Sequence, residues 1–302
     1  MPPDNKTSEK SLREKVNTVP GTILVATVLC VTCSLVVAGA AVGLKSTIEA
    51  NKTLDRQKNV VMAAGLLKKD ELTAKRVNEL FAEGGTIRKE LIDLETGKPV
   101  DLDEVKIDLN TYDPREAAKN PKFSVKIPAD ADDAGIKRRE KYAYVYKVVG
   151  KSGELNQIVI PIYGKGLWST LYGFIALEKN INTVDGITYY DHGETPGLGA
   201  EIQNPDWQAK WVDKSVYDDG QVELSVIKGA VDSTSDQAAY QVDGLSGATI
   251  TSNGVTNMIH YWLGPNAFGP YLDTLRSNLN SSNSDSQKAA VLRVPASGGT
   301  NG

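Results

Sequence analysis

A run of 23 residues without a single charge, residues 22–44, constrains this chain more than any other feature. A helix needs about 20 mostly apolar residues to cross a hydrocarbon core of roughly 30 Å, and this run leaves room for tilt. Its Gly, Ala, Ser and Thr residues would let neighbouring helices approach closely. The sequence therefore predicts one membrane-spanning helix over residues 21–44, preceded by a short arm at residues 1–20.

A cleaved secretory signal is the alternative interpretation of this run. Basic residues precede it, and residues 38–40 read Ala-Gly-Ala, which is typical of a cleavage site. The apolar core of a signal is usually about 7 to 15 residues long, and this run exceeds that before residue 38, which favours a retained anchor. Basic residues flank the run on both sides, so the charge rule does not determine its orientation.

The composition narrows the function classes. A chain of 302 residues with 40% hydrophobic residues allows one anchor and one sizeable globular region. A net charge of -4, without a dense basic stripe, argues against a nucleic-acid partner. Only His192 and His260 are present, which disfavours histidine-based metal or triad chemistry, and we expect no metal site. Cys30 and Cys33 both lie within the predicted span, where packing is favoured over metal binding.

The pattern of the remaining chain predicts an α+β domain. Strands with apolar alternation are expected at residues 142–149, 157–163, 171–177, 184–190 and 222–226, which would form a mainly antiparallel sheet. Helices are expected at residues 49–67, 71–82, 205–212, 253–263 and 268–276. The predicted organisation is juxtamembrane helices and a variable segment at 45–140, with loop and short strands at 96–128, then the domain at 141–277 and a disordered tail at 278–302.

A small, glycine-bearing turn, D-G-L-S-G-A-T-I-T at residues 243–251, offers a threonine hydroxyl. Gly247 and Ala248 have almost no side chain, so the active site of another protein could approach Thr249 closely. This pattern is typical of a modification site. The alternative is an ordinary turn leading to a helix that is capped by Thr251 or Ser252.

Two further segments are rich in glycine. Residues 192–201 read H-G-E-T-P-G-L-G-A-E and predict a rigid loop with exposed backbone N–H donors, although such glycine pairs also occur in surface turns. Residues 164–174 read G-K-G-L-W-S-T-L-Y-G-F and place aromatic side chains beside small residues, where a planar ligand could approach the backbone. The alternative for this second segment is a strand whose aromatic residues belong to the core.

Together, the three segments resemble the FMN-binding subunits of bacterial sodium-translocating NADH:quinone reductases, in particular the C subunits, and their Rnf-type relatives. In that family FMN is joined through its phosphate to the threonine of S-G-A-T, which is Thr249 here. The motifs and the resemblance imply no catalytic acid, base or nucleophile on this chain. They imply a covalent FMN surrounded by Leu167, Trp168, Ser169, Glu194, Thr195, Gly197, Leu198, Gly199, Lys228, Asp243, Ser246, Gly247, Ala248 and Thr249.

The resemblance also implies a function and a location. It implies an electron-carrier subunit of a sodium-pumping NADH:quinone oxidoreductase, anchored by a single span in the bacterial cell inner membrane with its FMN domain in the periplasm. The implied partners are other membrane and cytoplasmic subunits, together with a flavin transferase as the modifying enzyme. G-L-W-S at residues 166–169 favours this branch over the G subunit of an Rnf complex. A non-redox, membrane-anchored scaffold subunit is the alternative from another class.

Overall fold

The computed structural model describes residues 18–291, apart from residue 106 and residues 108–111. The chain divides into two units, residues 1–54 and residues 55–302. Most of the predicted N-terminal arm lies outside the described residues, and so do residues 292–302 of the predicted tail.

The charge-free run lies in one long helix, α2 Val19–Ala63, of 45 residues. Its apolar window has a mean hydropathy of 2.5 and none of that window is buried within the chain, so α2 has the length and composition of a membrane-spanning helix. Thr27 and Thr32 donate their hydroxyls to the carbonyls of Ile23 and Val28 at 2.8 Å, which satisfies these polar groups inside the helix itself. The helix continues past the apolar run without a break, as one of the two sequence-based options had it.

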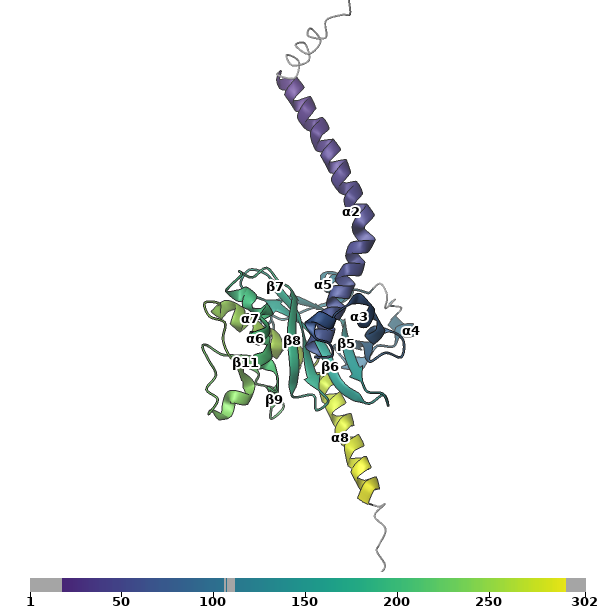
Figure 1. Cartoon of the computed structure of the whole chain (residues 1–302), viewed down its shortest axis with the longest axis vertical. Helices are drawn as coiled ribbons and strands as arrows, with labels where there is room; N and C mark the ends of the chain where they lie inside the picture. Colours follow the sequence, from purple (N-terminus) through teal and green to yellow (C-terminus); the bar gives the residue numbers. More distant parts are fainter. Residues whose placement is uncertain (1–17, 106, 108–111, 292–302) are drawn as a thin grey trace, which may run out of the picture. The chain divides into compact units, whose positions relative to one another are not determined.

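A six-stranded antiparallel sheet, in the order β2-β1-β5-β6-β7-β8, forms the centre of the second unit (Figure 1). The strands are β1 Ile87–Asp93, β2 Lys98–Pro99, β5 Tyr142–Val149, β6 Leu155–Lys165, β7 Thr170–Glu178 and β8 Val184–Asp191. Hairpin turns join β6 to β7 and β7 to β8, so the sheet is built mainly from neighbours in the sequence.

Helices and short strands surround this sheet. The helices are α3 Ala74–Phe81, α4 Leu102–Val105, α5 Pro114–Lys119, α6 Pro205–Gln208, α7 Thr249–Leu263 and α8 Gly269–Val291, with 3-10 turns η1 Lys69–Glu71, η2 Gly199–Gln203, η3 Ala209–Trp211 and η4 Asp236–Tyr240. The remaining strands form three pairs, β3 Ser124–Lys126 with β4 Arg138–Glu140, β9 Tyr217–Asp218 with β10 Gln221–Val222, and β11 Ser225–Val226 with β12 Gln241–Val242.

The two faces of the sheet are covered by different parts of the chain. Ile187 and Tyr189 of β8 belong to the main apolar core, which also contains Trp207 of α6 and residues of α7. On the alternate positions of the same strand, Thr188 donates its hydroxyl to the carbonyl of Asn59 at 3.1 Å. Because successive side chains of a strand point to opposite faces, the last turns of α2 dock on the face opposite α7.

Three predicted elements differ in the structure. Residues 222–226, predicted as one strand, contribute to two separate strands, because Glu223 and Leu224 both donate their backbone N–H to the carbonyl of Val216 and the chain turns there. The segment predicted as loop with short strands contains the helix α5, whose N-cap Asp113 accepts from the amide of Arg115 at 2.8 Å.

The third difference is at the C-terminal end, where α8 runs to Val291, so residues 278–291 are helical rather than disordered. No Gly or Pro follows Pro270 before the helix ends. Leu275 and Leu279 pack against the core, and the hydroxyl of Ser277 donates to the carbonyl of Asp273 at 2.9 Å. The polar composition that suggested disorder is therefore compatible with a helix held at its N-terminal end by packing.

A buried carboxyl group, Glu140 at the end of β4, lies beside the sheet with 2% of its surface exposed. The hydroxyl of Tyr163 donates to its Oε2 at 2.6 Å. Burial raises the pKa of Glu140 to about 7, although the hydrogen bond from Tyr163 and the charge of Arg139 act in the opposite direction. The folded protein therefore favours the protonated carboxyl.

This pKa predicts that the domain loses stability as the pH rises. A carboxyl whose pKa is higher in the folded state stabilises the fold below its unfolded pKa, and this contribution disappears as the pH rises through about 7. We expect Glu140→Gln to remove about 2–4 kcal/mol of pH dependence, at 1.36 kcal/mol per pKa unit. Urea unfolding of the detergent-solubilised chain at pH 5 and pH 8.5 measures this, with exposed Glu95→Gln as the control. An unchanged pH dependence in Glu140→Gln would contradict the assignment.

Candidate functional site

The turn between β6 and β7 presents two apolar side chains to the outside. Leu167 is 42% exposed and Trp168 is 67% exposed. Gly166 begins the turn, and a Cβ at this position would lie 2.7 Å from Oε1 of Glu194, so no larger residue fits without displacing that carboxylate. The turn is therefore held close to the loop that contains Glu194.

The carboxylate of Glu194 is the central acceptor of the site. It accepts backbone N–H groups from Leu167 at 3.2 Å, Trp168 at 2.9 Å and Ser169 at 3.2 Å, and the hydroxyl of Thr251 at 2.6 Å. Its burial alone would raise the pKa of Glu194, but the bonds from Thr251 and the three amides outweigh this and lower the pKa. One ionised carboxylate thus joins all three glycine-rich segments.

The loop at residues 192–201 is fixed by its own backbone. The amide of Gly193 donates to Oγ of Ser169 at 2.6 Å, and the carbonyl of Thr195 accepts from the amides of Leu198 and Ala200 at 3.1 Å. Gly197 has a φ of +75°, a conformation that glycine adopts without strain. Thr195, Gly197 and Leu198 are exposed, so the loop is ordered yet accessible.

The S-G-A-T segment forms the start of α7, and its two threonines have different environments. Thr249 is the first residue of the helix and is exposed, whereas Thr251 is only 1% exposed and already donates to Glu194. The N-cap Ala248 makes no side-chain hydrogen bond, and the hydroxyl of Ser252 accepts from the amide of Leu245 at 3.1 Å. Neither Thr251 nor Ser252 caps the helix, which contradicts the alternative of an ordinary capped N-terminus.

A residue of the loop also approaches this turn directly. Gly247 has a φ of +71°, and a Cβ built on it would lie 3.0 Å from Cδ2 of Leu198. Ser246 and Gly247 are exposed, like Thr249. The hydroxyl of Thr249 is therefore accessible from solvent beside the loop at residues 192–201.

Two predicted residues, Asp243 and Lys228, lie at the back of the turn. Asp243 pairs with Lys210 at 2.6 Å and accepts from the amide of Val231 at 2.8 Å, and the hydrogen bond from Lys210 lowers the pKa of Asp243. Lys228 is exposed. Both carboxylate oxygens of Asp243 are thus engaged by the protein, so its contribution is to hold the turn.

Lys228 lies beside the same turn because the two backbones are in contact. The amide of Gly244 donates to the carbonyl of Gly229 at 2.8 Å, and a Cβ on Gly244 would lie 2.3 Å from the carbonyl oxygen of Ile227. Lys228 sits between these two contacts in the sequence, which places a cation next to the S-G-A-T turn.

The accessible apolar surface of the domain is concentrated here. Among the described residues from 55 onward, six large hydrophobic side chains are exposed: Leu102, Leu167, Trp168, Leu198, Val212 and Ile250. Four of these, namely Leu167, Trp168, Leu198 and Ile250, belong to the three segments that Glu194 joins, and we call them the apolar rim. A rim of this kind is typical of a site for a flat apolar ring.

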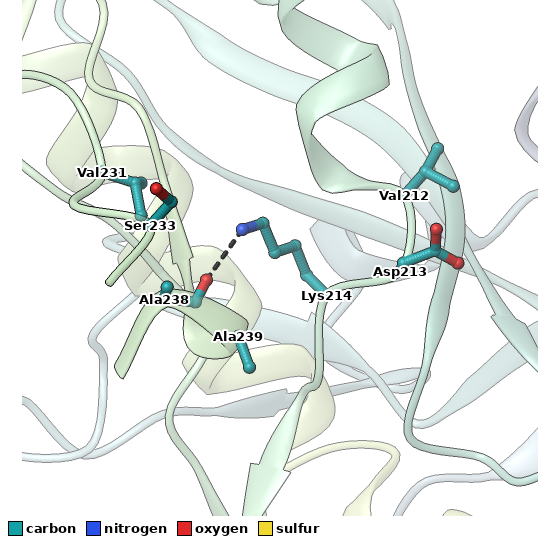
Figure 2. Close-up of a pocket in the computed structure, with 7 residues that line it drawn as sticks. All are labelled: Val212, Asp213, Lys214, Val231, Ser233, Ala238 and Ala239. Carbon is teal, nitrogen blue, oxygen red and sulfur yellow. Dashed lines mark hydrogen bonds between the residues drawn. The ribbon is translucent and has the colours of Figure 1, made fainter. Parts of the chain in front are cut away.

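A separate hollow of about 360 Å³ lies between residues 212–214 and residues 231–239 (Figure 2). The ammonium of Lys214 donates to the carbonyl of Ala238 at 2.7 Å inside it. The residues that line this hollow come from outside the three glycine-rich segments, so the apolar rim rather than the hollow is the candidate site.

Comparison with known proteins decides the family. Residues 166–264 match the family model described as FMN-binding domain. The C subunit of the Na(+)-translocating NADH-quinone reductase from Pseudomonas aeruginosa is 47% identical over 256 residues, which cover 84% of this chain and 95% of that relative. The chain belongs to the C-subunit family of Na(+)-translocating NADH-quinone reductases.

Other members of the C-subunit family agree with this. The Yersinia pestis relative is 45% identical over 256 residues, 84% of this chain and 92% of its own length. The crystal structure of Shewanella oneidensis NqrC matches with a TM-score of 0.63 and 37% identity, over 73% of this chain and 96% of that one. The predicted α+β class with a mainly antiparallel sheet is confirmed, and so is the sodium-pump branch over the Rnf branch.

Sequence reasoning placed most of the C-subunit site but not its connections. The structure brings together the predicted residues of the turn, the loop and the S-G-A-T segment through Glu194. Thr251 was regarded only as an alternative cap, and its role as a donor to Glu194 was missed. The sequence carries no signal for this bond, because 57 residues separate its partners.

The crowding around Glu194 yields a prediction for Gly199. A Cβ at this position would lie 2.6 Å from Oγ1 of Thr251 and 2.8 Å from Oε2 of Glu194. We expect Gly199→Ala to lower the Tm by roughly 5 °C, because overpacking costs about 1–3 kcal/mol. Gly193→Ala in the same loop is the control, since its Cβ would meet Cβ of Ser169 at 3.3 Å. Equal Tm values for the two variants, measured by thermal scanning, would contradict the crowding argument.

Proposed function

We propose that this chain carries FMN, joined by a phosphoester to the hydroxyl of Thr249, and relays electrons as a subunit of a Na(+)-translocating NADH:quinone oxidoreductase. The observation that carries the proposal is the contrast between two threonines of one helical turn. Thr249 is exposed at the start of α7, whereas the hydroxyl of Thr251 is buried and bound to Glu194. A modifying enzyme can therefore reach only the first of them.

The start of α7 suits a phosphoryl group. The first amides of a helix have no acceptor within the helix, and its dipole favours negative charge there. α7 has 15 residues, no acidic residue in its first turn and no side-chain cap. A phosphodiester on Thr249 carries one negative charge and would supply the missing acceptors, with Lys228 as a nearby cation. Ser246, Gly247 and Ala248 leave space around the attached group.

The apolar rim suits the isoalloxazine ring. Leu167, Trp168 and Leu198 would border the ring, and Gly197, Gly199 and Thr195 would bring backbone groups of the loop near its polar edge. Bound FMN supplies the capacity to accept and release electrons one or two at a time. The chain itself holds the turn and the loop in register through Glu194, and Asp243 holds the S-G-A-T turn through Lys210 and Val231.

The membrane arrangement follows from the anchor and the family. The apolar part of α2 would hold the chain in the bacterial inner membrane by a single span. The domain would lie on the periplasmic side, where a covalent bond prevents loss of the cofactor to the surroundings. A flavin transferase would attach the FMN, and the other membrane and cytoplasmic subunits of the reductase would be its partners, as the names of the relatives support.

Intact mass of the full chain, produced in a host with a flavin transferase, tests this proposal. We expect a gain equal to FMN minus water that maps to the peptide containing Thr249, and in-gel fluorescence of the denatured chain. Material produced in a host without the transferase serves as the control. A colourless chain of unmodified mass from the transferase-containing host would contradict the proposal and favour a scaffold subunit.

A further inference from the structure

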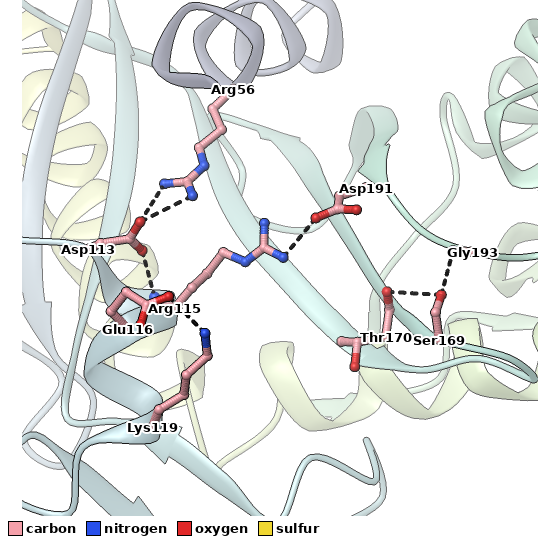
Figure 3. Close-up of polar contacts among 9 residues, drawn as sticks. All are labelled: Arg56, Asp113, Arg115, Glu116, Lys119, Ser169, Thr170, Asp191 and Gly193. Carbon is pink, nitrogen blue, oxygen red and sulfur yellow. Dashed lines mark hydrogen bonds and ion pairs between the residues drawn. The ribbon is translucent and has the colours of Figure 1, made fainter. Parts of the chain in front are cut away.

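Arg115 of α5 contacts the ends of two neighbouring strands of the sheet. Its NH2 group donates to Oδ2 of Asp191 at 2.8 Å, and its guanidinium carbon lies 3.5 Å from the centre of the Tyr172 ring. Asp191 and Tyr172 face each other across β8 and β7 in the sheet register. Figure 3 shows Arg115 reaching from α5 to Asp191. One side chain thus spans both strands at the same level.

These two strand ends lead directly into the candidate site. β8 ends at Asp191, and the loop at residues 192–201 begins with the next residue. β7 begins at Thr170, directly after the turn at residues 166–169. The same two segments also meet where the amide of Gly193 donates to Oγ of Ser169 (Figure 3). Arg115 is therefore placed to fix the spacing between the loop and the turn from outside the site.

A second arginine holds α5 in place. Both terminal nitrogens of Arg56, in the last turns of α2, donate to Oδ2 of Asp113 at 3.2 Å. Oδ1 of Asp113 accepts from the amide of Arg115 at 2.8 Å, which caps α5 (Figure 3). A continuous series of charged contacts therefore runs from the docked end of α2 through α5 to Asp191.

We propose that Arg115 is a positioning residue for the flavin loop at residues 192–201, and that the Arg56–Asp113 pair holds it in place. The inference rests on the proposed function only for the identity of the ligand. Asp191 is half exposed, so the ion pair alone would contribute little. Stacking of the planar guanidinium on Tyr172 adds a cation–π contact and orients the pair, which a lysine would do less well.

Hydrogen–deuterium exchange of the full chain in detergent, made without flavin, tests the positioning role. We expect Arg115→Ala to increase exchange of the peptide spanning residues 192–201 about tenfold, and Arg115→Lys to increase it by less. Arg56→Ala should increase exchange of the same peptide, and the strands β5 and β6 should be unchanged. The matched control is Arg76→Ala, which removes an ion pair with Glu71.

Unchanged loop exchange in Arg115→Ala would overturn the proposal. If Arg115→Ala does not fold, Asp191→Asn decides the question, because it removes the charge of the partner and leaves Arg115 on Tyr172. An increase of about threefold in loop exchange is expected for this variant, and wild-type exchange would overturn the proposal.

The flavinylated chain provides the second measurement. The midpoint potential and the visible circular dichroism of the covalent flavin should shift in Arg115→Ala and return towards the wild-type values in Arg115→Lys. Identical potential and dichroism in all three proteins would contradict positioning of the flavin. A wild-type chain that takes up no flavin would contradict the proposed function alone, since loop exchange still decides the role of Arg115.

Discussion

Thr249→Ala is expected to abolish covalent flavin attachment completely, because it removes the only exposed hydroxyl at the start of α7. Thr251 cannot replace it, since its hydroxyl is buried and bound to Glu194. The fold should be preserved, because the Thr249 side chain is exposed. The measurement is intact mass and in-gel fluorescence after production with a flavin transferase, with circular dichroism as the check on folding.

Ser246→Ala is the matched control for this experiment. Ser246 is an exposed hydroxyl in the same turn, three residues before Thr249. Its loss should leave the mass gain of the wild type unchanged, since the attachment site is at the helix start. Full flavinylation of Thr249→Ala, or loss of flavin in Ser246→Ala with Thr249 intact, would move the site to the serine.

Glu194→Ala is expected to cause the largest loss of stability within the site. It leaves the amides of Leu167, Trp168 and Ser169 and the hydroxyl of Thr251 without their acceptor. Loss of hydrogen bonds to a charged group should cost about 3 kcal/mol, or roughly 10 °C in Tm. The hydrogen bonds lower the pKa of Glu194, so its contribution is present above its unfolded pKa and is lost as the pH falls through the folded pKa.

Thermal scanning at pH 7 and at acidic pH measures both effects. Glu194→Gln should have an intermediate Tm and less pH dependence, because its amide keeps one acceptor and carries no charge. Glu201→Ala is the control in the same loop, where the carboxylate accepts from Asn204. A Glu194→Ala variant as stable as Glu201→Ala would show that the three segments are held together by something other than this carboxylate.

Periodicity and composition predicted most of the fold. The strands at residues 142–149 and 184–190 were predicted within two residues of β5 and β8, because buried strands show clear apolar patterns. The pattern is weaker where packing decides, as in α8, whose polar second half carries no apolar stripe. It is also weaker around α5, where the helix has only six residues and depends on Asp113 as its cap.

Within the site, the residues and their connections differ in predictability. The motifs placed Thr249, Glu194 and Trp168 among the candidates, because glycine and small residues mark close approach of backbone. The contacts of Arg115 were not predictable, since 76 residues separate it from Asp191 and no motif includes it.

The sequence by itself determined the membrane anchor, the α+β class and the three motifs, because apolar length, strand alternation and glycine spacing are local properties of the chain. Only the tertiary structure decided which threonine is accessible and which is held by Glu194, and only it brought Arg115 to the flavin loop. Burial and hydrogen bonding between distant residues depend on how the sheet places its strand ends side by side, and no local pattern specifies that.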